Sequence, residues 1–466
     1  MDLKQAYLSF GVVSMANMSE SEGSLPLIAV TAAVGAIVLL FTLLCSVFRK
    51  DKPKEEIESE QDKKTANAGS EKNNSNKKVK PATKTAKKPA HISFSHTWLS
   101  CTLKGHSSRI VSLDFSPNGK YLITASEDRA LMLWSVKEFR QKEHKYIRGN
   151  VEFDSATHVA FSPDSRALVA SLANENAVRI FRLGKKDDGS HNVTISGALD
   201  FPSKHKLDII GVGISSSGKW IMTCSSDTTI LIWDLKGEVL ATIDTHQVNN
   251  SCGKVSPCGR FVASSGFTSD VKVWEVVFDK SGSFSSVKRA FELKGHSAGV
   301  YDFDFNNDSR RMASVSKDNT WKVWDTDVRY DMGQDPKLLY SGKVSYPGPA
   351  LIALSPDGRT VAVGVDTSIA FWDAANEHQD QVLENVHAES MSCLKFDIGG
   401  RYLVCSGGKH VQVLHNVTGY KATIADLEEK LRTASGPGMK DRLKQQVSEA
   451  KEALENILLS SKDSPK

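Results

Sequence analysis

The sequence predicts an all-β fold, a seven-bladed β-propeller, with an N-terminal transmembrane helix before it and a C-terminal α-helical hairpin after it. Three observations predict it: a 24-residue apolar run without charge, a turn motif that recurs seven times, and a C-terminal segment with helical periodicity. A chain of 466 residues with 40% hydrophobic residues is long enough for one large β architecture with appendages.

The apolar run from Leu25 to Phe48 is the predicted transmembrane helix. Its 24 residues measure about 36 Å as a helix, enough to cross ~30 Å of hydrocarbon. Glu20 and Glu22 precede the run. Four basic residues follow it and set the topology: Arg49, Lys50, Lys52 and Lys54. The positive-inside rule then leaves residues 1–24 as a short lumenal N-terminus and places the rest in the cytosol. The alternative is a buried helix of a soluble domain.

Residues 49–90 are predicted to form a disordered basic linker. They contain 13 Lys or Arg and 7 Asp or Glu, with hardly an aromatic or large aliphatic side chain, and so cannot bury a core. The Lys77–Lys88 segment carries only positive charge. It is either a solvated spacer or a contact for anionic lipid heads or RNA phosphates. The segment has no aromatic residues to stack on bases, which favours the spacer.

Residues 91–417 are periodic. Seven turn-like pentamers each end in Lys or Arg: "SPNGK" at 116, "SPDSR" at 162, "SSSGK" at 215, "SPCGR" at 256, "NNDSR" at 306, "SPDGR" at 355 and "DIGGR" at 397. A large residue follows each turn at a distance of 17 to 19 residues: Trp134, Phe181, Trp233, Trp274, Trp324, Trp372 and Leu414. A histidine stands ten residues before five of the turns: His106, His205, His246, His296 and His387. Three β-rich runs fit between histidine and tryptophan and a fourth precedes the next histidine, which is typical of a propeller blade.

Gly-His followed at this distance by Trp-Asp resembles the WD-repeat family. The resemblance implies a closed propeller in which the strand Leu99–Leu103 completes the blade that holds Leu414. It also implies structural tetrads of buried, mutually hydrogen-bonded side chains, which are architecture rather than ligands. These are His106, Ser126, Asp128 and Trp134; His205, Ser225, Asp227 and Trp233; and His296, Ser316, Asp318 and Trp324. Three further blades keep fragments: His246 and Trp274, Asp366 and Trp372, and His387.

Residues 418–466 are rich in Ala, Glu, Lys and Leu and predict two helices separated by "GPG" at 436. Ile424, Leu427 and Leu431 lie at helical spacing in the first helix. The second carries a longer stripe: Met439, Leu443, Val447, Ala450, Leu454 and Ile457. The stripes either pair with each other or the propeller, or form a coiled coil with a partner or a second copy.

One motif points to an enzyme. "GHSAG" at 295 matches the G-x-S-x-G pattern of a nucleophile elbow, with Ser297 as the nucleophile. An elbow needs a helix after the serine, whereas the following "VYDFDF" alternates like a strand. We therefore expect no catalytic residue. The seven cysteines have no regular spacing and no C-x-x-C, so we expect neither a disulfide framework nor a metal or cofactor site.

The function that fits best is a non-enzymatic, membrane-tethered, cytosol-facing scaffold that binds partner proteins. The order of anchor, basic linker, seven blades and helical tail resembles one animal member of the WD-repeat family, most specifically in "SSDTTILIWDLKGEVL", "SPCGRFVASSGFTSDVKVWEV" and "NDSRRMASVSKDNTWKVWDTDV". That resemblance implies residence in the endoplasmic reticulum membrane and stress signalling through the kinase PERK. The alternative is an RNA-associated translation regulator that uses the basic linker; a serine hydrolase at Ser297 is the least favoured. The partner-binding residues and the oligomeric state stay unknown at this stage.

Overall fold

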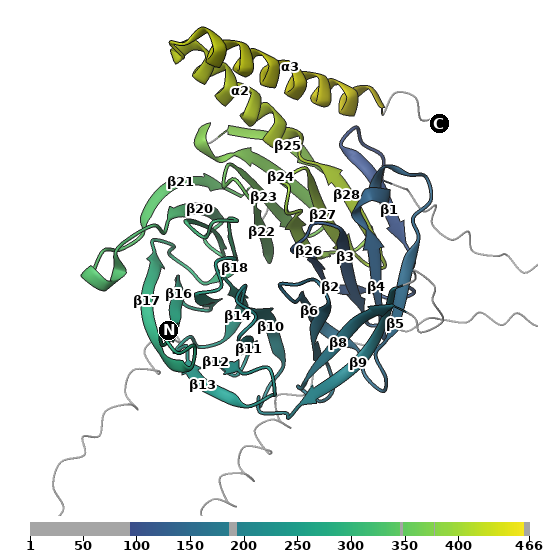
Figure 1. The fold of residues 1–466 in the computed structure, drawn as a ribbon, viewed down its shortest axis with the longest axis vertical. Helices are drawn as coiled ribbons and strands as arrows, with labels where there is room; N and C mark the ends of the chain where they lie inside the picture. The colour runs from purple at the N-terminus through teal and green to yellow at the C-terminus, as the bar shows by residue number, and fades with distance from the viewer. Residues whose placement is uncertain (1–93, 186–192, 345–347, 377, 461–466) are drawn as a thin grey trace, which may run out of the picture. The chain divides into compact units, whose positions relative to one another are not determined.

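The computed structural model describes residues 94–185, 193–344, 348–376 and 378–460 (Figure 1). The predicted lumenal segment, the transmembrane helix 25–48 with its flanking charges, and the linker 49–90 lie outside the described residues. No helix in the described ranges has the length and hydropathy needed to cross a membrane.

Twenty-eight described strands form seven four-stranded antiparallel sheets, which confirms the predicted seven-bladed propeller. The first strand of each blade lies next to the first strand of the following blade around the central axis (Figure 1). In chain order these inner strands are β2 (Ile110–Phe115), β6 (Ala156–Phe161), β10 (Ile209–Ile214), β14 (Asn250–Val255), β18 (Val300–Phe305), β22 (Ala350–Leu354) and β26 (Met391–Phe396).

The second and third strands of each blade carry most of the buried residues, because the neighbouring blades cover both of their faces. The second strands are β3 (Tyr121–Ser126), β7 (Ala167–Leu172), β11 (Ile221–Ser225), β15 (Phe261–Gly266), β19 (Arg311–Ser316), β23 (Thr360–Val365) and β27 (Tyr402–Gly407). The third strands are β4 (Ala130–Ser135), β8 (Val178–Lys185), β12 (Thr229–Trp233), β16 (Asp270–Phe278), β20 (Thr320–Asp325), β24 (Ser368–Asp373) and β28 (His410–His415).

The outer strands are more exposed and vary more in length. They are β5 (Tyr146–Asn150), β9 (Val193–Phe201), β13 (Val239–Asp244), β17 (Phe284–Lys294), β21 (Lys337–Lys343) and β25 (His378–Leu383), and for the last blade β1 (Leu99–Lys104). β1 pairs with β28, and Leu99 lies opposite Leu414. The strand before the first Gly-His therefore closes the ring, as predicted, and no blade is left with an open edge there.

The seven pentamers form the turns between the first and second strands. In every blade, the first side chain of the pentamer accepts a hydrogen bond from the amide of the residue that follows the pentamer, as in Ser116 with Tyr121 at 2.9 Å. The fourth residue has a left-handed backbone in all seven turns, with φ between 59° and 73°. Glycine fills this position five times, and Ser165 and Ser309 fill it in the other two turns.

Short 3-10 helices follow three of the third strands: η1 (Val136–Arg140), η2 (Tyr330–Met332) and η3 (Ala374–Asn376). The chain ends in two helices, α2 (Val417–Thr433) and α3 (Pro437–Ser460), which pack against each other (Figure 1). Leu443, Val447 and Ile457 are buried, whereas Met439 at the start of the predicted stripe is exposed. Lys451 of α3 forms an ion pair with Glu428 of α2 at 2.7 Å. The apolar stripes are thus used within the chain, as one of the two predicted alternatives requires.

α2 is fixed to the propeller at its first turns. Asn416 caps the helix by accepting a hydrogen bond from the Gly419 amide at 2.9 Å. Thr418 and Lys421 both contact the carboxylate of Asp380 on β25, at 2.9 and 2.7 Å. Further along the helix, Asp426 forms an ion pair with Arg359, the last residue of a pentamer turn. The helices therefore begin on the last two blades, at the end of the propeller where the pentamers lie.

Candidate protein-interaction surface

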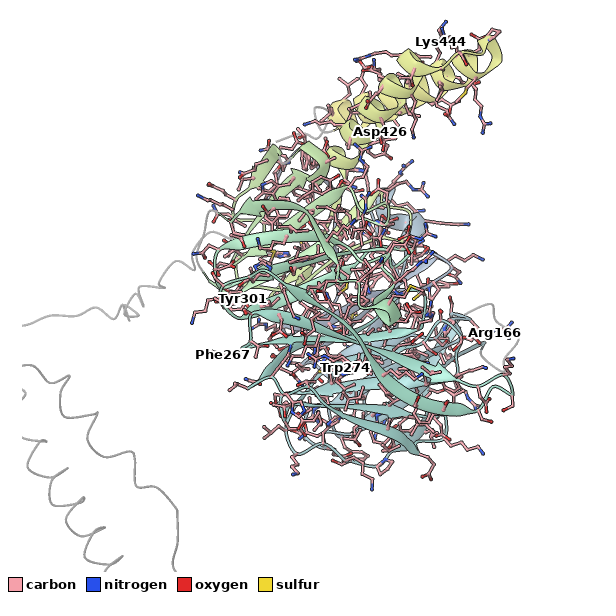
Figure 2. The ribbon with its side chains drawn as sticks, turned by 90° about the vertical axis from the view of Figure 1, so that its left-hand side faces the viewer. Arg166, Phe267, Trp274, Tyr301, Asp426 and Lys444 are labelled. Atoms are coloured by element: carbon pink, nitrogen blue, oxygen red, sulfur yellow. The ribbon has the colours of Figure 1, made fainter. Side chains whose placement is uncertain are left out.

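The antiparallel order of each blade gives the propeller two distinct ends. The pentamers and the connections from third to fourth strands lie at one end, which we call the turn face. The loops from second to third strands, and from the fourth strand to the next blade, lie at the other end, which we call the upper face. Figure 2 shows Phe267 of the upper face and Arg166 of a pentamer on opposite sides of the propeller.

A hydrogen-bonded chain of four side chains fixes the upper-face loops of the first blade. The Trp134 indole donates to Thr124 Oγ1 at 3.0 Å, and Thr124 Oγ1 lies 2.7 Å from His106 Nε2. His106 Nδ1 lies 3.0 Å from Asp128 Oδ2. The same carboxylate accepts the amides of Ser107 at 2.8 Å and of Ala130 at 3.1 Å. Asp128 thereby ties the loop that enters the blade to the hairpin between β3 and β4.

The third and fifth blades repeat this chain. In the third, His205 Nε2 lies 2.7 Å from Thr223, which accepts from Trp233 at 2.8 Å. Asp227 is 3.6 Å from His205 Nδ1, and Thr229 is nearer at 3.1 Å. In the fifth, the corresponding contacts are His296 with Ser314 at 2.8 Å, Trp324 with Ser314 at 2.9 Å, and His296 with Asp318 at 3.0 Å.

The structure corrects the predicted hydroxyl members of these tetrads. The predicted serines Ser126, Ser225 and Ser316 are buried but lie two residues too far along the strand, beside the hairpin. Their hydroxyls bond the loop backbone instead: Ser126 with Ser108 O at 3.2 Å, Ser225 with Leu207 O at 3.0 Å and Ser316 with Ala298 O at 2.9 Å. The imidazole reaches deeper into the blade, to the residue 18 positions after the histidine.

Two of the predicted fragments, those that contain His246 and Asp366, also differ from the tetrad arrangement. The His246 side chain is 79% exposed and pairs with Asp244, so it is not a tetrad member. Its neighbour Gln247 is buried and takes the position, accepting from the Ser264 hydroxyl at 2.8 Å. In the sixth blade, the Asp366 carboxylate accepts from Ser390. In the seventh, His387 Nε2 lies 3.2 Å from the sulfur of Cys405, which occupies the position of the hydroxyl.

The tetrads have fixed charges at neutral pH. Burial lowers the pKa of His106, His205 and His296, and the neighbouring aspartates offset this only in part. Burial opposes ionisation of Asp318, but hydrogen bonds from Thr320, Ser297 and His296 lower its pKa to about 2. Each tetrad therefore contains a neutral imidazole and a carboxylate anion, which is a stable structural arrangement.

Four large apolar side chains are exposed on the loops that the tetrads and their neighbours support. We call them the apolar quartet, and their exposed fractions are 89% for Phe153, 78% for Val248, 68% for Phe267 and 53% for Leu207. Sequence reasoning missed all four. The one available signal was an aromatic residue inside the polar hairpin "SGFTSD" at 265.

Three members of the quartet, Phe153, Val248 and Phe267, follow or precede buried residues. Phe153 lies between Val151 and Asp154, both at most 3% exposed, and Asp154 accepts the Asn174 amide at 3.0 Å. Val248 follows the buried Gln247, and the Phe267 amide donates to Asn249 O at 3.0 Å.

Phe153 also has a left-handed backbone with φ of 64°. This conformation costs a bulky residue about 1–2 kcal/mol. Strain together with exposure indicates a side chain presented for contact rather than for packing.

Ser297 does not lie in a nucleophile elbow. It stands in a loop between two strands, β17 and β18, and its amide donates to Asp318 Oδ2 at 2.9 Å. The adjacent His296 is already bonded to Asp318 and Ser314. Within the described ranges, no group of three or more His, Cys, Asp or Glu side chains is arranged to hold a metal ion.

The comparisons with known proteins agree with this architecture. The family model "WD domain, G-beta repeat" matches residues 97–135, 199–234, 237–275 and 287–325. Most of the second, sixth and seventh blades lies outside these matches, although the four strands of each are present. A guanine nucleotide-binding protein subunit beta from Oryza sativa subsp. indica is 26% identical over 341 residues, 68% of this chain and 83% of the relative.

Two relatives match along most of their length. Transducin beta-like protein 2 of Mus musculus is 45% identical over 436 residues, 92% of this chain and 97% of the relative. The protein of the same name from Homo sapiens is 49% identical over 373 residues, 79% of this chain and 83% of the relative. The chain belongs to the transducin beta-like protein 2 family of WD-repeat proteins.

Proposed function

We propose that the chain is a membrane-anchored, cytosol-facing scaffold that binds a partner protein through the apolar quartet. The observation that carries this proposal is the presentation of Phe153, Val248 and Phe267 on loops whose neighbouring residues are buried and hydrogen-bonded. A surface that is already rigid loses little conformational entropy on binding, and aromatic side chains contribute strongly to protein interfaces. Scaffolding of this kind requires no catalytic residue.

The proposed setting is the endoplasmic reticulum membrane, and the proposed partner is the stress kinase PERK. Resemblance to the family supports both, and the uncharged run Leu25–Phe48 with its following basic residues supports the anchor. Anchoring both proteins in the same membrane raises the effective concentration of the partner at the upper face, so a modest interface area suffices for binding.

The test is co-immunoprecipitation of PERK with the full chain from cells under endoplasmic reticulum stress. We expect the triple variant Phe153→Ser, Val248→Ser, Phe267→Ser to lose PERK. The matched control is Ile398→Ser, because Ile398 is also an exposed aliphatic residue, 42% accessible, but lies in a pentamer on the turn face. Wild-type recovery of PERK by the triple variant would exclude Phe153, Val248 and Phe267 as the binding site.

The membrane topology has its own test. Sequons begin at Asn192, Asn249, Asn307 and Asn416, all on the predicted cytosolic side. We expect a glycosidase to leave the mobility of the full chain unchanged at these sites. A mobility shift that Asn249→Gln or Asn307→Gln abolishes would reverse the proposed orientation.

The RNA alternative predicts a different outcome for the same protein. Deletion of residues 72–90 would then abolish crosslinking to RNA, whereas the triple upper-face variant would crosslink like the wild type. Loss of PERK in the triple variant, together with no RNA crosslinking in the wild type, would exclude the RNA alternative and support the scaffold function.

A further inference from the structure

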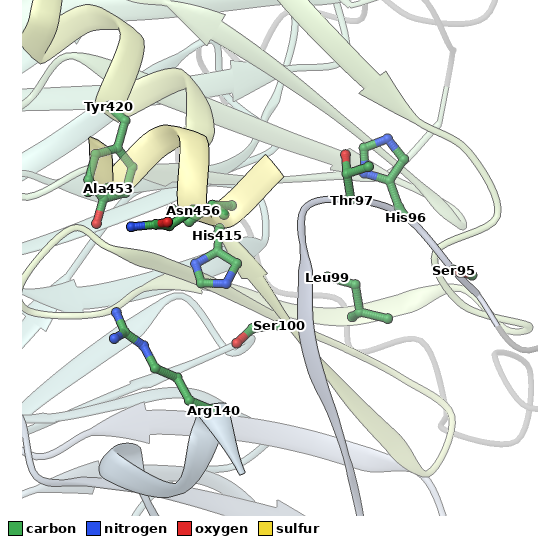
Figure 3. Close-up of a pocket in the computed structure, with 11 residues that line it drawn as sticks. Ser95, His96, Thr97, Leu99, Ser100, Arg140, His415, Tyr420, Ala453 and Asn456 are labelled. Carbon is green, nitrogen blue, oxygen red and sulfur yellow. The ribbon is translucent and has the colours of Figure 1, made fainter. Parts of the chain in front are cut away.

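A cavity of about 930 Å³ lies between the propeller and the helical hairpin (Figure 3). Four separate parts of the chain line it: the segment that leads into β1, the end of η1, the end of β28, and the helices α2 and α3. None of the tetrads and none of the apolar quartet takes part. The cavity is therefore independent of the proposed scaffold function.

Arg140 is the one charged residue among the lining side chains. The preceding residue Phe139 is fully buried and packs edge-on against Tyr402, and its carbonyl accepts from Ser100 Oγ at 3.1 Å. Arg140 Nε donates to the Tyr402 hydroxyl at 3.2 Å. These contacts fix the base of the guanidinium, while its two terminal nitrogens have no hydrogen-bond partner in the described part of the chain.

The guanidinium has no counter-ion in the part of the chain that the structure describes. Among the described residues, no carboxylate lies within the 4.0 Å that defines an ion pair with Arg140, and none of the lining residues is Asp or Glu. The hydrogen bond to Tyr402 raises the pKa of Arg140, which stays charged. Arg140 is itself exposed at this concave surface, and its guanidinium fork matches the geometry of carboxylate and phosphate oxygens, so the arrangement suits an anion.

The other polar groups around Arg140 suit the same kind of ligand. Figure 3 shows His415, Tyr420 and Asn456 on the same side of the cavity as the guanidinium. Burial, followed by the charge of Arg140, lowers the pKa of His415 to about 4, so the ring is neutral and adds no second positive charge. The Tyr420 hydroxyl and the Asn456 amide have no partner in the described ranges, and both can donate a hydrogen bond.

We propose that this cavity binds an oxyanion, a carboxylate or phosphate group, through the guanidinium of Arg140 with hydrogen bonds from Tyr420 and Asn456. Leu99 and Ile457 line the same space, so the anion is carried on a small organic body rather than bound as a bare ion. Because Arg140 belongs to the first blade and Asn456 to α3, a bound anion links the hairpin to the propeller.

The experiment uses the full chain in detergent micelles and four probes at matched ionic strength. Inorganic phosphate and glycerol 3-phosphate represent phosphate, acetate and succinate represent carboxylate, and sodium chloride is the background. Ligand-observed NMR gives the affinity and thermal unfolding gives the stabilisation. We expect saturable binding of at least one class at millimolar concentration, with a higher melting temperature, and the comparison of the two pairs shows which class the cavity takes.

The variants separate this cavity from other basic surfaces. Arg140→Gln is expected to weaken binding about tenfold or more, since it removes a charge-assisted contact. Arg140→Lys keeps part of the affinity. Lys137→Gln is the control, because Lys137 is an exposed cation of the same 3-10 helix that does not line the cavity. Asn456→Asp changes an exposed side chain, so we expect the fold to be kept. The new carboxylate pairs with the guanidinium and repels the anion.

Three results would overturn the proposal. These are no saturable binding of any probe to the wild type, equal affinity in Arg140→Gln, or equal affinity in Asn456→Asp. Circular dichroism of each variant shows whether a loss reflects the site or the fold. If Arg140→Gln does not fold, the affinity of Asn456→Asp alone decides whether the anion binds in this cavity.

Discussion

At the residue scale, the hydroxyl that joins the indole to the imidazole is the least replaceable atom of each tetrad. Thr124 Oγ1 contacts both Trp134 Nε1 and His106 Nε2 in a fully buried position. Thr124→Val keeps the shape of the side chain but leaves a buried donor and a buried acceptor without partners, which costs about 2–3 kcal/mol of unfolding free energy.

Urea unfolding of the full chain in detergent measures this loss. Thr242→Val is the matched control, because Thr242 lies on the outer strand β13 with its side chain exposed. Equal stability of the two variants would show that the hydroxyl does not stabilise the blade.

The resemblance to the WD-repeat family placed the histidine, aspartate and tryptophan of three tetrads but could not choose the hydroxyl. In these three blades the histidine and the tryptophan stand at a fixed spacing, and the aspartate stands six residues before the tryptophan. Thr124 and Ser126 both carry hydroxyls and point to the same side of β3, since they are two residues apart. Only the position of the imidazole ring in the folded blade shows which of the two hydroxyls it contacts. For the same reason, the spacing selected His246, whereas the structure places its neighbour Gln247 inside the blade.

The buried histidines make the stability of the propeller dependent on pH. Burial lowers the pKa of His387 to about 4 from its usual 6.5. The unfolded chain therefore takes up a proton at a higher pH than the folded chain does. The stabilising contribution is fully present above pH 6.5 and is lost as the pH falls toward 4, which amounts to about 2 kcal/mol at pH 5.

His387→Gln removes this titration while keeping a polar side chain of similar length. We expect its unfolding free energy to fall less steeply between pH 7 and pH 5 than that of the wild type, measured by urea denaturation at each pH. Parallel curves for the two proteins would contradict the assignment of this titration to His387.

At the scale of single elements, the pentamer turns offer a direct test of backbone strain. Ser165 and Ser309 both have a left-handed backbone, with φ of 59° and 60°. The Ser165 hydroxyl is buried without a partner, whereas the Ser309 hydroxyl accepts the Cys258 amide at 2.9 Å. Ser165→Gly relieves strain and loses no hydrogen bond, so it should raise the unfolding free energy by about 1 kcal/mol.

Ser309→Gly is the paired variant in the same turn position. It relieves the same strain but removes a hydrogen bond between neighbouring blades, so its expected effect is close to zero or destabilising. Thermal unfolding of both variants checks the difference. A Ser309→Gly protein that gains as much stability as Ser165→Gly would show that the contact with Cys258 contributes nothing.

The elements themselves followed from the sequence because their signals are local. Turn residues and alternating β-branched stretches predicted the strands even in the second blade, which has Phe181 in place of tryptophan. The apolar quartet could not be predicted in the same way. Loop residues have no periodicity, so nothing in the sequence distinguishes an exposed Phe153 from its buried neighbour Val151.

At the scale of the whole molecule, the resemblance to the WD-repeat family predicted closure, but nothing in the sequence predicted the cavity beside it. The resemblance implied that the strand before the first Gly-His completes the last blade, and β1 does so by pairing with β28. The cavity at Arg140 needs four segments, from Ser95 to Ile457, to meet with a specific geometry. No local pattern carries that information, and the absence of a counter-ion among the described residues becomes visible only once the neighbours of Arg140 are known.

Closure also predicts where unfolding begins. β1 and β28 are held together without a covalent bond, and the paired residues Thr102 and Gln412 lie 310 positions apart with their side chains 2.6 Å from each other. A disulfide between Thr102→Cys and Gln412→Cys locks this pair, and linking so distant residues stabilises by at most about 5 kcal/mol. We expect the oxidised double variant, verified by peptide mapping, to unfold far more slowly in denaturant than its reduced form. The reduced form is the internal control, because it lacks the same Thr102–Gln412 hydrogen bond and differs from the oxidised form only in the disulfide. Equal unfolding rates for both forms would mean that unfolding begins elsewhere in the propeller, and that the pairing of β1 with β28 is not the first contact to break.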